Sequence, residues 1–228
     1  MSEEITQYPN EWLNNSPIKD IEPIEELDII EIGDEATLQE LVRDTRIKGN
    51  PDFKIYAQSP IEVKELHIDS ISPMALYVLE KGLHQQHRFV KTLRGHNIEY
   101  FRHKGSITYK QGSVCKISPP VVEKYTEEDG TIHYGLIDGI HRVVTAKQLG
   151  EESLVCIVIS NPPLPPSAMP NRWSEVILRE DVPPTHKKKK FRDLNTVQWP
   201  EELIIRPDVD PRYYLYRDYS RLGSYGIR

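Results

Sequence analysis

The pattern of apolar and polar positions divides the chain into short strands and a few helices. Residues 62–71 carry apolar side chains in an imperfect alternation, which predicts a strand. The next segment predicts a helix from Ser72-Pro73 to Arg94, because serine can accept amide hydrogen bonds at a cap and proline fits the first turn. Its apolar stripe consists of Leu76, Leu79, Leu83 and Val90. Gly95 is expected to end this helix.

Three clear elements follow one another in the second half of the chain. Residues 119–138 predict a β-hairpin, because two runs of strand-forming residues flank Asp129-Gly130, a pair typical of tight turns. Residues 139–150 predict a helix that ends at Gly150. Residues 154–160 are almost all apolar and predict a strand that is buried on both faces.

The two ends of the chain have a less regular pattern. Residues 1–27 are polar and acidic and contain three prolines, and five further prolines follow in 161–170. The remaining short elements are a strand at 27–33, a helix at 34–44 capped by Asp34, a loop at 46–53 and an extended segment at 107–117 with a turn at Gly112. We therefore expect an α+β protein with a central domain at 62–160, an acidic N-terminal arm at 1–61 and a C-terminal extension at 161–228.

Charge is distributed unevenly along the chain of 228 residues, whose net charge is −6. Residues 1–60 hold 14 acids and 5 Lys or Arg, while the remaining chain holds 21 acids and 24 Lys or Arg. This balance argues against binding of nucleic acid over the whole surface and leaves room for a local basic patch. No apolar run is long enough for a membrane span, and the N-terminus lacks the features of a signal peptide, so we expect a cytoplasmic protein. Two cysteines are too few for a disulfide framework.

One strand-to-helix junction combines unusual residue types, since residues 138–142 read Asp-Gly-Ile-His-Arg. The amides of a helix N-terminus attract anions, Gly139 lets a ligand approach the backbone, and Arg142 can offer a planar fork to a phosphate. His141 can donate a hydrogen bond or become cationic beside a phosphate. Asp138 fits a helix cap, a Mg²⁺ ligand or a base for a hydroxyl group. These residues alone leave two interpretations open, a capped helix with a solvated first turn and a phosphate site beside an acid.

The order of the elements around this turn resembles the ParB/sulfiredoxin-like superfamily. In that superfamily a Pro-Pro strand leads through a hairpin into a strand that ends at a Gly-X-His-Arg or Gly-X-Arg-Arg turn. The resemblance covers about residues 62–160 and depends on Pro119-Pro120-Val121-Val122, the turn at 138–142 and Gly150. It implies a mixed sheet with helices and a turn that binds nucleotide phosphates.

Departures from two branches of the superfamily narrow the function. The catalytic cysteine of sulfiredoxin would fall at position 140, where this chain has isoleucine, so sulfinic acid repair is excluded. ParB partition proteins, which bind CTP and DNA, have arginine where this chain has His141, and the segment after 160 predicts no helix-turn-helix. The form Asp-Gly-X-His-Arg is that of the ATP- or ADP-dependent free serine kinases.

The resemblance to the kinase branch implies a role for each residue of the turn. Gly139, Ile140, His141 and Arg142 would bind the phosphates of ATP or ADP, with CTP as an alternative. Asp138 would position Mg²⁺ or activate the hydroxyl of a small acceptor such as an amino acid. The base of such kinases is an acid near the start of the preceding helix, and the nearest carboxylate here is Glu80, about two turns into the expected helix. The expected catalytic residues are Asp138, Glu80 and His141.

Several other interpretations remain open from the sequence. The alternative to a kinase is a ParB-like nucleotide-sensing or DNA-associated module, or a nuclease. The basic run Lys187–Lys190 is either a solvated face, a contact for nucleic acid or a guide for phosphate-bearing substrates. His84 and His87 share a helix face, but the glutamate of a zinc-protease motif does not lie between them. The tail at 212–228, rich in tyrosine and arginine, is expected to dock on the body, pair with a second copy in a homodimer or close over the site.

Overall fold

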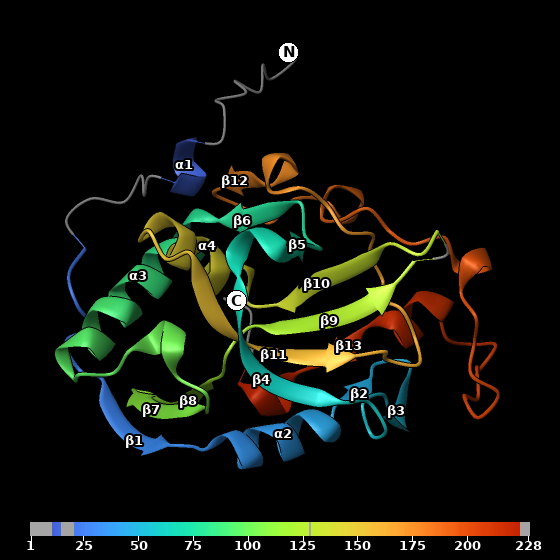
Figure 1. Ribbon diagram of the computed structural model, residues 1–228, viewed down its shortest axis with the longest axis horizontal. Helices are drawn as coiled ribbons and strands as arrows, with labels where there is room; N and C mark the ends of the chain where they lie inside the picture. Colours follow the sequence, from blue (N-terminus) through green and yellow to red (C-terminus); the bar gives the residue numbers. More distant parts are fainter. Residues whose placement is uncertain (1–10, 15–20, 128, 224–228) are drawn as a thin grey trace.

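A computed structural model describes residues 11–14, 21–127 and 129–223. Its centre is a five-stranded mixed sheet with the strand order β4-β11-β9-β10-β5 (Figure 1). The strands of this sheet are β4 (Ile61–His67), β5 (Ile71–Pro73), β9 (Val121–Thr126), β10 (Ile132–Asp138) and β11 (Ser153–Ser160). β9 and β10 form the expected antiparallel hairpin, while β11 runs parallel to β9 and β5 runs parallel to β10. The expected α+β class is confirmed.

Both faces of the central sheet are covered, which explains the continuous apolar run of β11. Leu154, Cys156 and Val158 pack in one cluster, and their neighbours along the strand pack in another. Successive side chains of a strand point to opposite faces of the sheet. When both faces are buried, both sets of side chains are apolar, and the strand reads as a continuous apolar run. The expected buried strand at 154–160 is confirmed.

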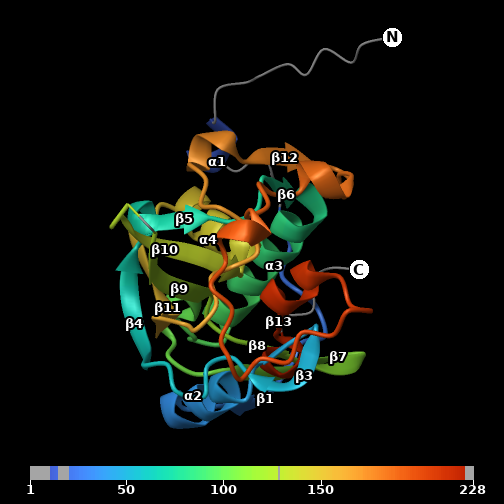
Figure 2. The same ribbon diagram turned by 90° about the vertical axis from the view of Figure 1, so that its right-hand side faces the viewer.

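Helices from different parts of the chain cover the two faces of the sheet. α3 (Glu80–Gly95) and α4 (Ile140–Gln148) contribute Val90, Val143 and Ala146 to the cluster on one face. α2 (Glu35–Arg43) and the C-terminal segment contribute to the cluster on the other face, which therefore contains residues from 38 to 222. Figure 2 shows the C-terminal segment, in red, lying beside the sheet and its helices. One apolar core thus includes parts of all three expected segments.

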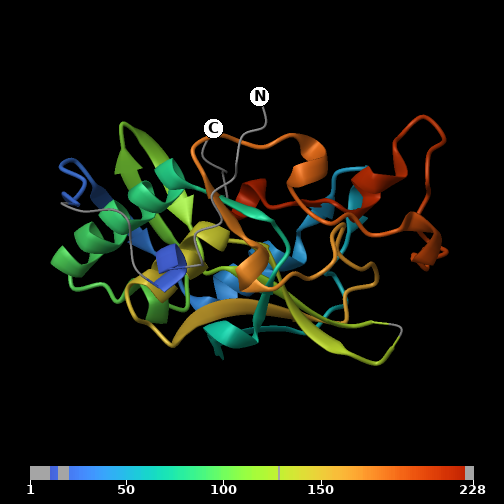
Figure 3. The same cartoon turned by 90° about the horizontal axis from the view of Figure 1, so that it is seen from above.

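Smaller sheets and short turns complete the described part of the chain. β1 (Asp28–Ile32), β7 (Ile107–Gln111) and β8 (Ser113–Ile117) form one antiparallel sheet, β13 (Arg217–Asp218), β2 (Arg46–Ile47) and β3 (Asn50–Lys54) form a second, and β12 (Ile177–Arg179) pairs with β6 (Tyr77–Leu79). The remaining elements are α1 (Glu11–Asn14) and 3-10 turns at Ile68–Ser70, Tyr100–Arg102, Trp173–Glu175, Thr185–Lys187, Leu194–Thr196, Pro211–Leu215 and Ser220–Leu222. Seen from above, α3 lies toward one end of the molecule and the tip of the β9–β10 hairpin toward the other (Figure 3). Within the described residues, none of the helices is long and apolar enough to cross a membrane.

Three secondary-structure predictions differ from the structure. The strand expected at 62–71 ends at His67, where a 3-10 turn at Ile68–Ser70 leads into β5. The helix expected from Ser72 begins at Glu80, because β5 pairs with β10 and β6 pairs with β12. Pro73 ends β5, which is an edge strand, where a missing amide hydrogen costs no ladder bond. The loop expected at 46–53 instead contains β2 and most of β3, because β2 pairs with β3 on one side and with β13 on the other. In each case pairing with a distant segment outweighs the local signal.

Other local signals correctly predict the structure. Asp34 caps α2 by accepting a hydrogen bond of 2.7 Å from the amide of Thr37. Gly112 separates β7 from β8 with φ of 71°. The expectations for residues 1–10, 15–20 and 224–228 lie outside the described residues.

A buried ion pair attaches the C-terminal segment to the central sheet. Arg217 of β13 donates to Glu123 of β9 through Nε at 2.8 Å and through Nη2 at 3.1 Å, and both side chains are almost fully buried. The Glu123 carboxylate also accepts a hydrogen bond from the hydroxyl of Tyr56. Nη2 of Arg217 donates further to the carbonyl of Leu164 at 2.7 Å. This network determines where the C-terminal segment lies relative to β9 and β10.

Candidate functional site

The turn between β10 and α4 has the geometry of a strand-to-helix junction that can receive a ligand. β10 ends at Asp138 and α4 begins at Ile140, with Gly139 between them in the left-handed region at φ of 94°. A side chain is disfavoured in that region, which explains the glycine. The first amides of an α-helix have no partner within the helix and carry a partial positive charge. The junction therefore presents backbone donors beside an acidic residue.

Arg142 is a structural part of this junction. Its guanidinium forms an ion pair with Asp138, one turn earlier, and also donates to the carbonyl of Ser118. Only 6% of Arg142 is exposed, and a Cβ added at Gly139 would lie 2.9 Å from its Nε. The guanidinium thus packs under the glycine and orients the Asp138 carboxylate, while an edge of Arg142 still lines the neighbouring cavity.

His141 is neutral at pH 7. Burial lowers the pKa of His141 to about 4, an effect that Asp138 opposes and Arg142 reinforces. Its Nε2 accepts a hydrogen bond of 3.1 Å from the amide of Leu79, so the proton of the neutral ring is on Nδ1. The ring therefore joins the start of α4 to the end of β6 and brings no positive charge to the turn.

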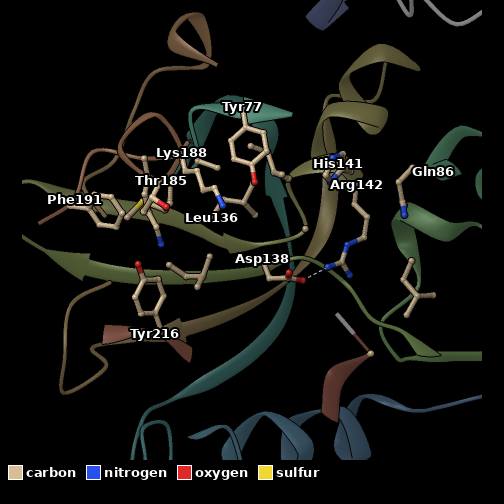
Figure 4. Close-up of a pocket in the computed structure, with 18 residues that line it drawn as sticks. Tyr77, Gln86, Leu136, Asp138, His141, Arg142, Thr185, Lys188, Phe191 and Tyr216 are labelled. Atoms are coloured by element: carbon tan, nitrogen blue, oxygen red, sulfur yellow. Dashed lines mark hydrogen bonds and ion pairs between the residues drawn. The ribbon is translucent and has the colours of Figure 1, made fainter. Parts of the chain in front are cut away.

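The turn opens into a cavity of about 520 Å³ (Figure 4), a size within the range of small-molecule sites. The lining residues from the central part of the chain are Met74, Ala75, Tyr77, Gln86, Ile117, Leu136, Ile137, Asp138, Gly139, Ile140, His141 and Arg142. Those from the C-terminal segment are Thr185, Lys188, Lys189, Phe191, Tyr216 and Gly223. The Lys188 and Tyr216 side chains lie on one side of Asp138, and Arg142 lies on the other (Figure 4). All four expected phosphate-binding residues, 139–142, thus line a common cavity.

The basic run is divided by the fold. Lys187 and Lys190 are exposed, and Lys190 pairs with Glu175. Lys188 and Lys189 are partly buried and line the cavity. These two lysines were not among the expected site residues, and the only signal for them in the sequence was the run of four lysines. The described part of the tail docks on the body, since Tyr214, Leu215, Tyr219 and Leu222 lie in the core. Tyr216 and Gly223 also line the cavity.

Glu80 lies outside the cavity. It is the first residue of α3, its side chain is exposed, and it is not among the lining residues. The side chain that α3 contributes to the lining is Gln86. Asp138 is accordingly the only carboxylate that lines the cavity within the described part of the chain.

The histidines of α3 have a structural environment. His87 is buried, and its Nε2 lies 2.8 Å from Oε1 of Gln148 in α4, while His84 is exposed. No group of three or more His, Cys, Asp or Glu side chains suited to a metal ion occurs within residues 11–14, 21–127 and 129–223. A Mg²⁺ ion at Asp138 would therefore take most of its ligands from water and from the phosphates of a nucleotide.

Comparison with known proteins identifies the family of this domain. The family model described as ParB CE domain matches residues 37–176, which include the central sheet and the turn at 138–142. No curated protein matches the chain significantly. The match extends the resemblance noted in the sequence on both sides of 62–160, and it covers more than half of the 228 residues. The chain therefore belongs to the ParB CE domain family.

Proposed function

We propose that the protein binds a nucleotide through its phosphates at the turn 138–142 and transfers a phosphoryl group to a small hydroxyl compound. The observation that carries this proposal is the position of the α4 N-terminus at a cavity with cations on two sides, Arg142 on one and Lys188 on the other, with Lys189 in the same lining. Phosphoryl transfer depends on positioning and on neutralising charge, which such a cavity can supply. ATP and ADP are the preferred donors, with CTP as the alternative, and a free amino acid is the preferred acceptor.

Each residue of the turn has a role in this proposal. The amides of Ile140 and His141 and the open face of Gly139 receive phosphate oxygens. Asp138 either holds Mg²⁺ together with the phosphates or takes the proton of the acceptor hydroxyl. A bound Mg²⁺ would neutralise charge on the transferred group. Arg142 fixes the direction of the Asp138 carboxylate, and His141 fixes the start of α4 against β6.

A second candidate function is nucleotide binding without turnover. Glu80 is exposed outside the cavity, and Asp138 is the only lining carboxylate in the described part of the chain. A kinase that used Asp138 for Mg²⁺ would need another group as base. This single acid is the observation that favours a nucleotide-sensing module. The DNA-associated and nuclease alternatives gain less support, because half of the basic run is turned into the cavity.

The deciding experiment is a turnover assay on the full chain with Mg²⁺ and ATP, ADP or CTP, with and without amino acids and other small alcohols, followed by phosphorus NMR. A kinase consumes nucleotide only when an acceptor is present and yields a phosphate ester. A sensor binds nucleotide in calorimetry without steady consumption. Asp138→Asn is the matched variant, because the amide keeps an oxygen for Arg142 but loses the charge. If neither binding nor consumption of any of the three nucleotides is measured, the proposed function is wrong.

A further inference from the structure

One wall of the cavity is built by residues that lie outside the family match. The ParB CE match ends at residue 176, and Lys188, Lys189, Phe191 and Tyr216 lie beyond it. The Lys188, Phe191 and Tyr216 side chains lie on the opposite side of Asp138 from Arg142 (Figure 4), and Lys189 lines the same cavity. The lining of the site is therefore completed by a segment beyond the matched domain.

Lys189 lines this cavity and a smaller adjoining one that also includes Ser167 and Arg217, and its amino group lies in a cationic environment. Its Nζ donates to Oγ of Ser167 at 2.9 Å and lies 4.3 Å from the centre of the Tyr216 ring. The cations that lower its pKa are Lys48, Arg217 and Lys188. The charge of Arg217 is balanced by Glu123, but neither Lys188 nor Lys189 forms an ion pair with any residue of the described ranges.

A partly buried cation without an acidic partner favours an incoming anion. Burial and then the neighbouring cations lower the pKa of Lys189 to about 8, so its ammonium is charged but poorly stabilised at pH 7. Burying a charge costs free energy unless the charge is paired, and an anionic ligand would supply the missing pair.

The backbone around these lysines is fixed before any ligand arrives. The carbonyl of Lys188 accepts from the amide of Leu76 at 2.9 Å, and the carbonyl of Lys190 accepts from the amide of Met169 at 2.8 Å. Arg192 forms a bidentate ion pair with Glu127 at 2.8 and 3.0 Å, which joins the same segment to the β9–β10 hairpin. A site held in this way loses little conformational entropy on binding.

We propose that Lys188 and Lys189 form an anion-binding site, supplied by the C-terminal segment, for a phosphate or carboxylate group of the ligand. The site lies across the cavity from the α4 N-terminus, so the ligand or pair of ligands carries anionic groups at both ends. The proposal depends on the proposed function only for the identity of that ligand. In the proposed reaction, the same site would select an anionic acceptor or hold the far end of the phosphate chain.

Calorimetry on the full chain tests the proposal with two matched variants. Lys188→Gln/Lys189→Gln removes two charges from the cavity, and Lys187→Gln/Lys190→Gln removes two charges from the exposed part of the same run. The probes are Mg-ATP, inorganic pyrophosphate and malonate at constant ionic strength. We expect the cavity variant to lose about tenfold or more in affinity for at least one probe, since hydrogen bonds to charged groups contribute about 1.5–3 kcal/mol. The exposed variant should lose about twofold or less, because solvated charges act weakly and at a distance.

Each outcome decides between the two proposals. Loss confined to pyrophosphate and ATP supports a phosphate site, and loss confined to malonate supports a carboxylate site. If ATP binds and both variants behave alike, the lysine site is overturned while the proposed function stands. If pyrophosphate or malonate binds through the lysines but no nucleotide binds, the nucleotide function fails and the lysine site stands. If none of the three probes binds the unmodified chain, the lysine site is overturned.

A second measurement covers the case in which the cavity variant fails to fold. The side-chain NMR signals of Lys188 and Lys189 are followed in the unmodified chain while pyrophosphate or malonate is added, with assignment from the single variants Lys188→Gln and Lys189→Gln. Shifts at these two lysines, without shifts at Lys187, support the site. Equal shifts at all lysines indicate non-specific screening and overturn it.

Discussion

The guanidinium of Arg142 joins Asp138, at the end of β10, to the carbonyl of Ser118, which precedes β9. These contacts make Arg142 an internal support of the turn as well as a lining residue. Phosphate binding at the turn therefore depends on the Asp138–Arg142 ion pair, which supports the turn. Any variant of either residue has to be tested for stability before it is tested for binding.

We expect Arg142→Ala to lower the free energy of unfolding by about 3 kcal/mol, because removing one partner of a largely buried pair leaves the other uncompensated. Urea unfolding measures this change. Arg142→Lys keeps the charge but cannot contact Asp138 and Ser118 in the same fork geometry, so it should have an intermediate effect. If Arg142→Ala lowers the free energy of unfolding by less than about 1 kcal/mol, a structural role for Arg142 is contradicted. The main role of Arg142 would then be its contact with the contents of the cavity.

A second prediction concerns the contact between Gly139 and Arg142. Gly139→Ala should destabilise the protein by about 1–2 kcal/mol or more, because a Cβ meets both a positive φ and the guanidinium at 2.9–3.0 Å. Gly150→Ala is the matched control, since Gly150 has φ of 79° and no atom within 4 Å of the added Cβ. The difference in unfolding free energy between the two variants isolates the contact with Arg142. Equal losses of unfolding free energy in the two variants would show that the positive φ alone explains why position 139 is a glycine.

The sequence predicts the turn and the hairpin because their signals are local. Asp129-Gly130 and Gly139 each specify a backbone conformation that neighbouring residues do not override. The start of α3 could not be predicted in this way, because β5 pairs with β10, more than 60 residues later. The four lysines at 187–190 are equivalent in the sequence, and tertiary contacts with Ser167, Phe191 and Tyr216 distinguish Lys189 from Lys187.

His141 provides a test by pH. Because burial lowers its pKa to about 4, below the usual value near 6.5, the unfolded chain binds a proton that the folded chain does not. His141 therefore adds stability above about pH 6.5 and loses it as the pH falls through 6.5 toward 4. Asp138 and Arg142 are the charged groups that modify this window.

The matched variant for this test is His141→Gln, which keeps an acceptor for the amide of Leu79 but does not titrate. Between pH 7 and pH 5, the unmodified chain should lose about 1–2 kcal/mol more unfolding free energy than His141→Gln. Urea unfolding at both pH values gives the difference, and an NMR titration follows the ring directly. A ring that titrates near pH 6.5 would refute the buried, neutral state.

We expect the charge of Lys189 to lower the stability of the folded protein while it favours the binding of an anion. Its ammonium is disfavoured in the folded chain, since its pKa is lowered to about 8 by burial and by Lys48, Arg217 and Lys188, with the Tyr216 ring packed against it. Lys189→Met removes that penalty and should raise the melting temperature at pH 7 by about 2–4 °C, equivalent to about 1 kcal/mol for a chain of this size. The penalty is complete below pH 8 and disappears as the pH rises toward 10.5, so the gain should shrink over that range. A melting temperature that falls at pH 7 would show that the contact with Ser167 outweighs the charge.

The last prediction concerns the Glu123–Arg217 ion pair, because this pair links the stability of the fold to the position of the segment that lines the cavity. Arg217→Met leaves the Glu123 carboxylate buried without its cation and should cost about 3–5 kcal/mol, measured by urea unfolding. Glu123→Gln/Arg217→Met removes both charges and should recover part of that loss. The same order should appear in limited trypsin digestion, since β13 and the neighbouring Tyr216 depend on this pair and loosening them exposes Lys188 and Lys189 to cleavage. If Arg217→Met loses stability without faster cleavage there, the pair supports the core alone and the wall of the cavity is held by Arg192 and Glu127.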